Sequence, residues 1–457
     1  MHILHAIHDF PPRHQAGSEI YALELARAQS ARHDVTILCA DYDPARDHGH
    51  VTWRVYQGLP VVEVVNNWRA ESFEETYRSR LMTARLRQLL EMLRPDVLHV
   101  HNLLNLSFEL PAVARQLGIP VAATLHDYTL VCASGGQRVH RRERYVCHEI
   151  DTARCARCFT ESPFHAQTTF ARVQVGGAGS RMLARTAATA RRIAPRLLSR
   201  AARAVRHIGP AVTQTDIETR MTAARRVFQE VDVFVAPSPA LGREFVALGL
   251  PAERLVVSDY GMATRPQVPR SGGGELLRIG FVGTLVWHKG VHVLLEAVRL
   301  LPPGRFTLQL FGNTTTFPDY TAELKALASG LPVTFAGGFS PAQSPEIYSQ
   351  IDVLVVPSLW PENSPLVIHE AFMTGVPVVG ARMGGIVDLI TDQVNGLLYD
   401  PSSPAALAAA LRQLIDDPAR VAALGSAAPP VKTVQQDARE WDTVYERLQR
   451  SHEAGTE

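Results

Sequence analysis

Apolar runs of the length of a buried strand alternate along the chain with longer stretches of helical periodicity. The amino-terminal part begins with MHILHAI, SEIYALELARAQSAR and DVTILCA, and DVLHVH, PVAATLHD and VDVFVAPS continue the series. A second alternating set runs from LRIGFVG through VHVLLEAVRLL to NGLLYD. Continuous apolar strands separated by helices are typical of parallel sheets that are covered on both faces. The pattern therefore predicts an α/β chain with two doubly wound, Rossmann-like domains.

The polar segment 259–276 is rich in Gly and Pro, which predicts a linker between the two domains. We therefore expect an amino-terminal domain over residues 1–258 and a carboxyl-terminal domain over residues 277–430. An amphipathic helix with a short tail, over residues 431–457, is expected to return to the amino-terminal domain. Two such domains are expected to face a central cleft, because ligands bind at the carboxyl ends of parallel strands.

One stretch of the amino-terminal domain, residues 162–215, has many arginines and neither Asp nor Glu. It predicts a helical insertion whose basic face is either simply solvated or in contact with anionic lipid or a phosphorylated acceptor. The formal net charge of the chain is only +1, which argues against binding nucleic acid by bulk charge. The first residues lack the features of a signal peptide, and apolar runs are too short to span a membrane. We expect a cytoplasmic protein, peripheral at the inner face of the membrane if the insertion binds lipid.

A carboxylate stands on each side of a predicted helix start in PSLWPENSPLVIHEAFMTGVPVVG, residues 357–380. Ser364 as N-cap, Pro at the first helical position and a glycine after the end predict a helix over residues 365–374, between two buried strands. Glu362 precedes this helix and Glu370 lies within it. The same spacing also fits an ordinary βαβ unit with two surface glutamates.

A second stretch, FVGTLVWHKGVHVLLEAV, predicts a strand that turns at Gly283 and enters a helix just after Lys289. Free N–H groups at a helix start, together with an ammonium group, bind phosphate. The GG turn of ARMGGIVDLI offers a similar helix start. With a phosphate held there, Glu362 and Glu370 would meet the rest of the ligand, and carboxylates suit the vicinal hydroxyls of a sugar. The alternative is a plain turn with a surface lysine.

These residues resemble a known family. Glu362, seven intervening residues and Glu370, followed by AFMTGVPVV and a GG turn, are similar to the EX7E signature of retaining nucleotide-sugar glycosyltransferases of family four, the glycosyl transferases group 1. The resemblance extends over nearly the whole chain and implies the GT-B fold. HDFPPRHQAGSE resembles the glycine-rich loop of the family, which would place Gly17 beside the donor diphosphate. Ala16 departs from the family, which usually has a second glycine.

The resemblance implies a role for each matching residue of the carboxyl-terminal domain. Glu370 would bind the nucleotide ribose, Glu362 would lie by the transferred sugar, and Lys289 would contact the diphosphate. Asn363 and Ser364 would add polar groups beside them. The nucleobase would lie along residues 335–339, near Gly337.

One departure affects the phosphate site. Thr284 stands where the family usually has an arginine, so either one phosphate-binding charge is missing or His288 or another arginine replaces it.

In the amino-terminal domain, TLHDY resembles a family motif whose histidine, here His126, lies near the transferred sugar. Asp127 would orient this histidine or bind the acceptor. His99 and His101 alternate with a valine on a predicted strand and therefore point the same way. A structural role for these three histidines, without ligand contact, is the alternative.

Family membership implies transfer of a sugar from a UDP-, GDP- or dTDP-linked donor to a hydroxyl of a glycan or lipid-linked acceptor. The anomeric configuration would be kept and no catalytic metal would be needed. Bacterial surface polysaccharide, lipopolysaccharide or glycolipid synthesis is the expected setting. The alternatives are a sugar-nucleotide epimerase or glycan phosphorylase of the same fold, and an inactive sugar-binding subunit.

Four of the five cysteines are clustered within residues 132–158 with the spacing C-x14-C-x7-C-x2-C. In a cytosolic chain such a cluster favours a metal site over disulfides, and four thiolates suit tetrahedral zinc. An iron–sulfur cluster, free or redox-active thiols and disulfides are the alternatives. The expected ligands of a structural zinc ion are Cys132, Cys147, Cys155 and Cys158.

Overall fold

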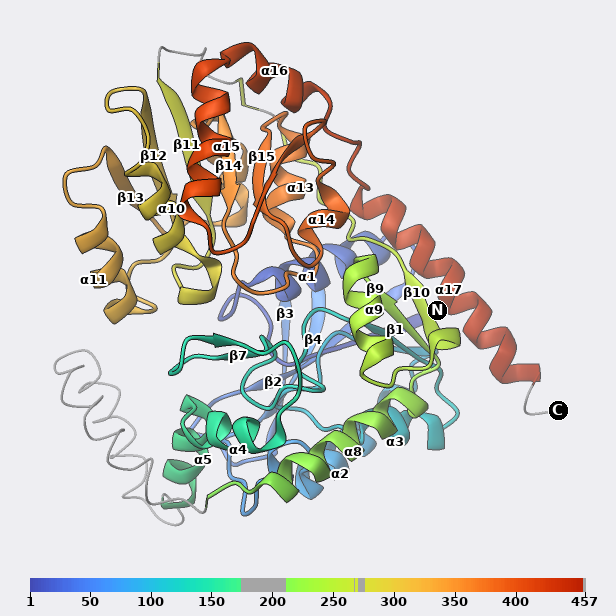
Figure 1. Cartoon of the computed structure of the whole chain (residues 1–457). Coiled ribbons are helices and arrows are strands. Elements are labelled where there is room, and N and C mark those ends of the chain that lie inside the picture. Colours follow the sequence, from blue (N-terminus) through green and yellow to red (C-terminus); the bar gives the residue numbers. More distant parts are fainter. Residues whose placement is uncertain (174–210, 267, 270–275, 455–457) are drawn as a thin grey trace. The chain divides into compact units, whose positions relative to one another are not determined.

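The computed structural model describes residues 1–173, 211–266, 268–269 and 276–454, which form two compact units (Figure 1). Unit 1 comprises Met1–Ala236, Glu244–Val257 and the chain from Ala438, and unit 2 comprises Pro237–Arg243 and Ser258–Asp437. The division after Val257 lies one residue before the boundary expected from the sequence.

Unit 1 contains an eight-stranded sheet that is parallel except for one edge strand. Hydrophobic strands such as β5 are buried on both faces, as in other helix-covered parallel sheets. In spatial order its strands are β10 (Leu255–Val257), β9 (Val233–Ala236), β6 (Val121–Thr124), β5 (Val97–Val100), β1 (His2–Ile7), β2 (Asp34–Asp41), β4 (Leu59–Val65) and the antiparallel β3 (Val51–Tyr56).

Helices surround this sheet, and two short strands form a separate hairpin. The helices are α1 (Gly17–Gln29), α2 (Arg80–Leu93), α3 (Leu110–Gln116), α4 (Thr152–Thr160), α5 (Pro163–Val173), α8 (Gln214–Glu230), α9 (Pro239–Ala247) and α17 (Val434–Ala454), with 3-10 turns η1 (Glu74–Thr76) and η2 (Ala252–Arg254). The hairpin consists of β7 (Val139–His140) and β8 (Tyr145–Val146). Helix α9 straddles the boundary of the two units, and α17 belongs to unit 1 from Ala438 onwards.

Unit 2 contains a six-stranded sheet in which every recorded pairing is parallel. In spatial order its strands are β13 (Val333–Gly337), β12 (Phe306–Phe311), β11 (Leu277–Val282), β14 (Val353–Val356), β15 (Val378–Ala381) and β16 (Gly396–Tyr399). The chain moves outward from β11 to β13, returns to β14, and then moves outward in the opposite direction. This is the doubly wound order expected from the sequence.

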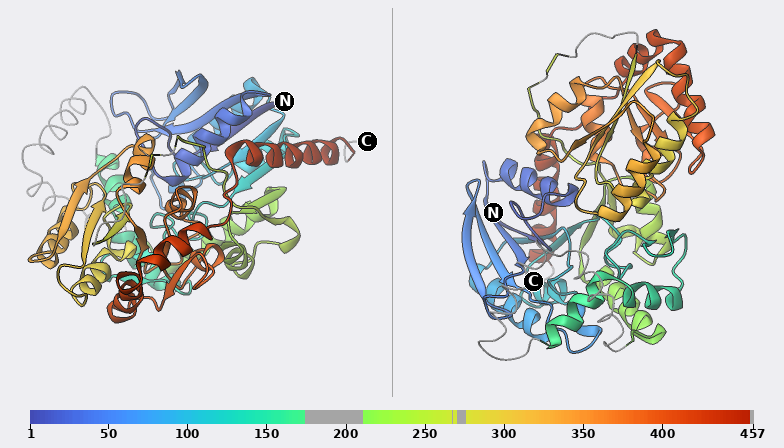
Figure 2. Two further views of the ribbon diagram at one scale, coloured as in Figure 1. Left: turned by 90° about the horizontal axis from the view of Figure 1, so that it is seen from above. Right: turned by 90° about the vertical axis from the view of Figure 1, so that its left-hand side faces the viewer.

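Helices cover both faces of the second sheet (Figure 2). They are α10 (Val291–Val298), α11 (Pro318–Leu327), α12 (Ser344–Ser349), α13 (Leu366–Met373), α14 (Ile386–Leu389), α15 (Pro404–Asp416) and α16 (Pro418–Ser426), with 3-10 turns η3 (Trp287–Lys289) and η4 (Pro341–Gln343). Helix α10 packs against α11 and α15, whereas α12 packs against α13. Right-handed crossovers place the helices of the two outward paths on opposite faces.

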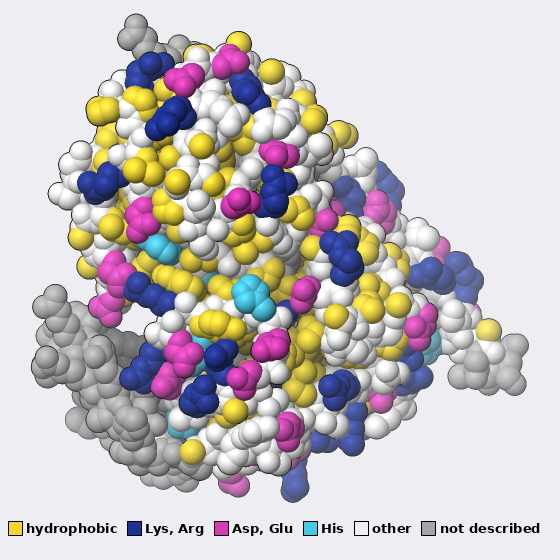
Figure 3. Space-filling model, in the orientation of Figure 1, with side chains coloured by type: hydrophobic (Ala, Val, Ile, Leu, Met, Phe, Trp, Pro, Cys, Tyr) yellow, Lys and Arg dark blue, Asp and Glu magenta, His cyan; other side chains and the backbone are white. Residues whose placement is uncertain are grey.

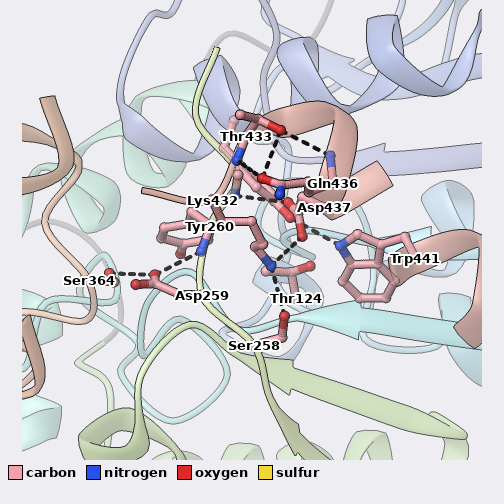
Figure 4. A network of polar contacts seen from close by, with 12 residues as sticks. Thr124, Ser258, Asp259, Tyr260, Ser364, Lys432, Thr433, Gln436, Asp437 and Trp441 are labelled. Carbon is pink, nitrogen blue, oxygen red and sulfur yellow. Dashed lines mark hydrogen bonds and ion pairs between the residues drawn. The ribbon is translucent and has the colours of Figure 1, made fainter. Parts of the chain in front are cut away.

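The first part of the expected linker is tied to unit 2. The backbone N–H of Gly261 donates to the Asp437 carboxylate at 3.0 Å, and Met262 forms a bridge with Thr433. Lys432 completes the junction with hydrogen bonds of 2.8 Å to Ser258 and to Asp437 (Figure 4). Segment 258–266 is therefore an ordered part of unit 2, although its composition indicates a linker.

The Arg-rich insertion lies largely outside the described residues, which end at 173 and resume at 211. The expectation that it contacts a membrane therefore rests on its sequence. Over the described parts of the face in Figure 3, Lys and Arg side chains are interspersed with Asp and Glu. Among the described residues, helices that combine the length and the apolar character needed to cross a membrane are absent.

Candidate active site

The carboxyl ends of β11 and β14 lie side by side where the strand order of unit 2 reverses. After β11 the chain turns toward β12, and after β14 it turns toward β15, so the two loops diverge. Open α/β sheets bind ligands in the crevice between such diverging loops. The loop after β11 contains Gly283 and Lys289, and the loop after β14 contains Glu362, Asn363 and Ser364.

Lys289 and Glu362 form an ion pair across these two loops. The Nζ atom lies 2.6 Å from Oε1 of Glu362, and the hydroxyl of Ser358 donates to the same oxygen at 2.5 Å. Glu362 is only 5% exposed, whereas the lysine side chain is 28% exposed. The ammonium also lies 5.5 Å from the ring centre of Trp360. It is therefore held by a buried carboxylate and an aromatic face, and it still reaches solvent.

Glycine allows the loops to approach each other this closely. A Cβ atom on Gly290, whose φ is 70°, would lie 1.8 Å from the carbonyl oxygen of Pro357. In the GG turn, a Cβ on Gly385 would lie 1.7 Å from the carbonyl oxygen of Asn363. Any side chain at either position would push the loops apart. The sequence suggested that the N–H groups of this turn bind an anion. The N–H of Gly385 instead donates to the carbonyl of Glu362 at 2.6 Å and stabilises the loop.

Glu370 projects from helix α13 and accepts a hydrogen bond from the hydroxyl of Tyr348 at 3.1 Å. Burial raises the pKa of this carboxyl group, while hydrogen bonds from Ser344 and Tyr348 and the charge of Arg265 lower it in part. A carboxylate has about four acceptor positions, so these bonds leave room for a ligand. Arg265 lies in the segment expected to be a linker, and sequence reasoning did not identify it.

Ser364 does not cap helix α13, which begins one residue later than predicted, at Leu366, with Pro365 in the cap position. Its hydroxyl donates to Asp259 at 2.7 Å (Figure 4). The same hydroxyl lies 2.9 Å from Nε2 of His369. Asp259 and His369 were not identified from the sequence either, because a contact across more than 100 residues leaves no local pattern. Ser364 thus fixes the loop to segment 258–266.

The ends of three neighbouring strands bring Gly337 close to Gly283. The N–H of Gly283 donates to Phe311 at 2.9 Å, and the N–H of Gly312 donates to Gly337 at 2.8 Å. Gly337 has a positive φ of 85° at the end of β13. Thr284 is exposed beside this edge, whereas His288 is 1% exposed and packs edge-on against Trp360. His288 is therefore poorly placed to replace the missing arginine.

In unit 1, four buried polar side chains form a line of hydrogen bonds from α1 through the sheet. His5 lies beside Gln29 and His101, with nitrogen–oxygen and nitrogen–nitrogen distances of 2.8 and 2.9 Å. His101 in turn lies 2.9 Å from Nε2 of His126. Burial lowers the pKa of His5 to about 4 and that of His126 to about 3. All three rings are therefore neutral at physiological pH, and the network stabilises this form.

Neutral rings carry one N–H each, so Gln29 fixes the direction of the whole line. Its amide N–H donates to the Tyr445 hydroxyl at 3.3 Å, which leaves its oxygen to accept from Nε2–H of His5. His101 then donates from Nε2 and His126 from its own Nε2. His126 consequently carries its basic lone pair on Nδ1.

Tyr445 extends the same network from helix α17. Its hydroxyl accepts from Gln29 and therefore donates to Nδ1 of His99, 2.6 Å away. Nε2–H of His99 then donates to the hydroxyl of Thr124 at 2.8 Å. His99 and His101 point the same way from β5, as predicted, with ring centres 4.2 Å apart. The partners His5, Gln29 and Tyr445 were not predicted, because they come from elements distant in the sequence.

Replacing Tyr445 with phenylalanine should lower the free energy of unfolding by roughly 1–3 kcal/mol, because a donor on Gln29 and an acceptor on His99 would lose a buried partner. Urea-induced unfolding followed by circular dichroism measures the change. The control is Tyr42→Phe, since Tyr42 is 50% exposed. Equal unfolding curves for both variants would show that the Tyr445 hydroxyl contributes nothing.

Asp127 is held in the loop that follows β6. Its carboxylate accepts from the backbone N–H of Thr129 at 2.7 Å and from the amide of Asn102 at 3.0 Å. Burial raises the pKa of Asp127. His126 is hydrogen-bonded to His101, so these two neighbouring residues of the loop after β6 are positioned by different partners.

Gly17 begins helix α1, with Ala16 in the cap position. The preceding loop is held by an ion pair of 3.1 Å between His8 and the buried Glu19. Hydrogen bonding and charge from His8 outweigh the effect of burial and lower the pKa of Glu19 to about 2. Sequence reasoning missed this pair.

The four clustered cysteines of unit 1 are free thiols, and the structure does not bring three of their sulfur atoms within 4.8 Å of one another. Burial, and next the thiol of Cys132, raise the pKa of Cys155 to about 12. Burial also raises the pKa of Cys147 and brings that of Cys158 to about 11, with Cys132 acting on both. Among the described residues, only His5, His99 and His101 have three potential ligand atoms within 4.8 Å of one another.

Two family models match the chain. Residues 16–177 match the model described as Glycosyltransferase Family 4, and residues 272–430 match the model described as Glycosyl transferases group 1. The first stretch falls within unit 1 and the second within unit 2.

Curated relatives are similar over part of their length. A sulfoquinovosyl transferase, SQD2, of Arabidopsis thaliana is 28% identical over 219 residues, which are 45% of this chain and 42% of the relative. A D-inositol 3-phosphate glycosyltransferase of Corynebacterium urealyticum is 35% identical over 180 residues, 37% of this chain and 41% of the relative. The chain thus matches less than half the length of these proteins.

Solved structures show the same fold over the whole length. Alr3699/HepE of Anabaena, crystallised with UDP and glucose, is 17% identical with a TM-score of 0.59, covering 99% of this chain and 100% of the other. Sucrose-phosphate synthase of Thermosynechococcus elongatus is 16% identical with a TM-score of 0.64, covering 99% and 98%. The fold is therefore GT-B, as the sequence predicts.

Proposed function

Because this chain belongs to the glycosyltransferases of family four, we propose that it transfers a sugar from a nucleotide-diphosphate donor to a hydroxyl group of an acceptor, with retention of configuration. Relatives that carry glycosyltransferase names and a solved structure with bound UDP and glucose support a nucleotide sugar as the substrate. The acceptor class that we propose is a glycan or a lipid-linked sugar.

The ion pair of Lys289 and Glu362 is the observation that carries this proposal. It places one cation and one carboxylate at the strand switch of unit 2, where open α/β sheets bind ligands. A sugar diphosphate presents negative phosphates next to neutral hydroxyls. The ammonium of Lys289 suits the phosphates, and the neighbouring carboxylate of Glu362 suits the hydroxyls of the sugar.

The chemistry assigned to unit 2 is stabilisation of the leaving group. As the bond to the sugar breaks, negative charge grows on the departing nucleoside diphosphate, and a fixed ammonium lowers the energy of that state. Lys289 supplies this charge. Glu362 orients the lysine and accepts hydrogen bonds from the transferred sugar, while Glu370 accepts from the ribose. In unit 1, His126 and Asp127 are assigned to the sugar and the acceptor.

A donor screen tests the proposed reaction. Incubation with UDP-, GDP- and dTDP-sugars in the absence of acceptor should release nucleoside diphosphate slowly from the cognate donor, as mass spectrometry would detect. The freshly released sugar should keep the anomeric configuration of the donor in its NMR spectrum. Formation of an isomeric nucleotide sugar without release of diphosphate would favour an epimerase. The absence of binding to every nucleotide sugar would leave only the sugar-binding alternative.

Glu370→Ala should weaken binding of the nucleoside diphosphate by about 10- to 100-fold, because the ribose hydroxyls lose hydrogen bonds to a charged acceptor. Isothermal titration calorimetry measures the affinity. The matched control is Glu346→Ala, on the neighbouring helix α12, where the side chain is exposed. Unchanged affinity in Glu370→Ala would contradict the assignment of the ribose to this carboxylate.

A further inference from the structure

A pocket in unit 1 is lined by the loops that follow β4, β5 and β6, and helices α4, α5 and α8 contribute to its walls. These loops lie at the carboxyl ends of parallel strands, where α/β sheets bind ligands. Aromatic rings and leucines form the apolar part of the lining, and amides, hydroxyls and charged groups form the rest. Such a mixed lining favours a ligand that has both apolar and polar surface.

A buried arginine, Arg220 of helix α8, forms part of this lining. It is 5% exposed, and its guanidinium donates to the carbonyls of Leu130 at 2.9 Å and Thr129 at 2.5 Å. The central carbon of the guanidinium lies 5.0 Å from the ring centre of Phe108 and 5.6 Å from that of Tyr77. The two hydrogen bonds use two of the five N–H groups of a guanidinium, so N–H groups remain for a ligand.

The positive charge of Arg220 has no carboxylate partner in the part of the chain that the structure describes. Glu75, an acidic residue of the lining, instead accepts from the backbone N–H of Glu71 at 2.8 Å. Residues 174–210, which lie outside the described ranges, contain neither Asp nor Glu and cannot supply a carboxylate. A buried charge is costly without an opposite charge nearby, so the pocket suits an anionic ligand.

The hydroxyl of Tyr77 is a second polar group in the lining that lacks a partner. The residue is 4% exposed, and its buried hydroxyl has no hydrogen-bond partner among the described residues. Burial, and next the charge of Glu74, raise the pKa of Tyr77 to about 12, so the hydroxyl keeps its proton and can donate. Buried hydroxyls in native proteins are usually hydrogen-bonded. A phenol and a guanidinium in one pocket are a pair of donors that suits an oxyanion.

One wall of the pocket contains Trp68 and Asn105, two residues other than glycine with positive φ angles of 52° and 63°. The indole N–H of Trp68 donates to the side-chain oxygen of Asn105 at 3.2 Å, and the amide of Asn66 donates to the backbone carbonyl of Asn105 at 2.8 Å. The left-handed region is unfavourable for a tryptophan, and backbone held in such a conformation is concentrated at ligand sites. This wall is therefore fixed before a ligand binds.

We propose that this pocket binds a sugar that carries an anionic group, with Arg220 and Tyr77 as the partners of the anion. A phosphate or a carboxylate accepts hydrogen bonds from a guanidinium and a phenol. The aromatic rings of the lining suit the apolar face of a sugar ring, and the amides suit its hydroxyls. A lipid chain would leave the polar part of the lining without partners, which argues against it.

The pocket adjoins a residue that is assigned to the acceptor. The carbonyl of Thr129 accepts from Arg220, and the N–H of Thr129 donates to Asp127 at 2.7 Å. A second pocket, lined by His126 and Asp127, shares Leu103 and Thr129 with the first. We therefore assign the anionic sugar as the acceptor. This assignment rests on the proposed function, whereas the binding of an anionic sugar does not.

Isothermal titration calorimetry of the full chain tests the proposal with glucose, galactose and mannose, each as the free sugar, the 6-phosphate and the uronate. At least one anionic form should bind about 10- to 100-fold more tightly than its free sugar, the usual gain from hydrogen bonds to a charged group. The phosphate and uronate arms show which anion the pocket takes. Equal affinity for the free and anionic forms, or no binding by any anionic form, would overturn the proposal.

Tyr77→Phe should weaken binding of the anionic sugar by about 10-fold, because the anion loses one donor. Thermal unfolding should be unchanged, since this hydroxyl has no partner within the described ranges. Tyr56→Phe, on the edge strand β3 outside the pocket, is the matched control. Arg220→Met should weaken binding by about 10- to 100-fold, whereas Arg226→Met, at an exposed position of the same helix, should match the wild type. Wild-type affinity in Tyr77→Phe and Arg220→Met would contradict the proposed partners.

The site in unit 2 could also bind a sugar phosphate, so Lys289→Ala is measured in parallel and should bind the anionic sugar as the wild type does. Affinity that is lost in Lys289→Ala and kept in Arg220→Met would place the anion in unit 2 and overturn the proposal. An anionic sugar that binds at Arg220 but accepts no sugar from any donor would contradict only its role as the acceptor. Slow donor hydrolysis without binding of any anionic sugar would contradict the pocket and leave the proposed function intact.

Discussion

Lys289→Ala is expected to lower kcat/KM for the donor by about 100- to 1,000-fold, the usual cost of removing one group that stabilises charge in the transition state. The chain has only three lysines, which are Lys289, Lys325 and Lys432. Because Thr284 stands where the family resemblance implies a second cation, we expect Lys289 to provide the main positive charge at this switch point. Release of nucleoside diphosphate under saturating and limiting donor gives kcat and KM separately.

Two further lysine variants separate position from charge. Lys325→Ala, on helix α11 of the same unit, should leave turnover unchanged. Lys289→Arg should recover only part of the rate, since a planar guanidinium does not fit a site shaped for a compact ammonium between a carboxylate and a ring. Full activity in Lys289→Ala would contradict the proposed leaving-group role.

The ion pair itself introduces a confounding effect, because removing the lysine leaves Glu362 buried and unpaired. Breaking a buried pair is strongly destabilising, whereas removing both charges is often nearly neutral. Lys289→Met/Glu362→Gln should therefore regain stability relative to Lys289→Met in urea-induced unfolding. If the pair is catalytic, the double variant stays inactive. Recovery of activity together with stability would show that the pair is structural.

The positions of Lys289, Glu362 and Glu370 in unit 2 could be predicted largely from the sequence because their determinants are local. A strand, a glycine turn and a helix start place Lys289, and the same pattern after β14 places Glu362 and Glu370. Each loop follows one strand, so the parallel order of the sheet then brings the loops together. The ion pair between Lys289 and Glu362 was not predicted, since the sequence gives their positions but not the direction of their side chains.

Other parts depend on contacts that the sequence does not encode locally. Gln29 and Tyr445 are more than 400 residues apart, and neither lies in a recognisable motif, yet together they fix the tautomers of four histidines. Ser364 satisfies every local rule for a helix cap but bonds Asp259 and His369 instead. In both cases a tertiary contact determines the hydrogen bonding, and the local sequence does not reveal it.

Acidification from pH 7 to pH 5 is expected to destabilise unit 1 steeply. Burial lowers the pKa of His99 and His101 well below 6.5, as it does for His5 and His126. In the unfolded chain each ring binds a proton near pH 6.5, so the unfolded state binds more protons than the folded state below that pH. The contribution of these neutral rings to the free energy of unfolding is therefore fully present above pH 6.5. It is lost as the pH falls toward the folded-state pKa values, about 4 for His5 and about 3 for His126.

The expected slope is roughly 1.4 kcal/mol per pH unit for each such ring while the folded ring stays neutral. His8 acts in the opposite direction. Its pKa is raised because Glu19 outweighs the effect of burial, so its pairing with Glu19 stabilises the folded state below pH 6.5. The carboxyl of Glu19 loses its contribution only as the pH falls from 4.5 toward 2. Burial also lowers the pKa of His48. Between pH 6.5 and 5 the five lowered histidine pKa values therefore outnumber the one raised value, that of His8, and stability decreases.

Urea-induced unfolding at a series of pH values measures this slope, and His101→Gln should reduce it by about one ring's share. The control is His14→Gln, whose ring is 64% exposed and lies outside the line of hydrogen bonds. Because His101→Gln interrupts the network and could unfold the unit, NMR titration of the wild-type rings provides an independent test. The four buried rings should keep their neutral signals to pH 5.5, because burial disfavours the charged form of each ring. Protonation of His5, His99 or His101 would also remove an acceptor that its neighbour needs. Protonation of these rings near pH 6.5 in the folded protein would show that burial does not hold them neutral.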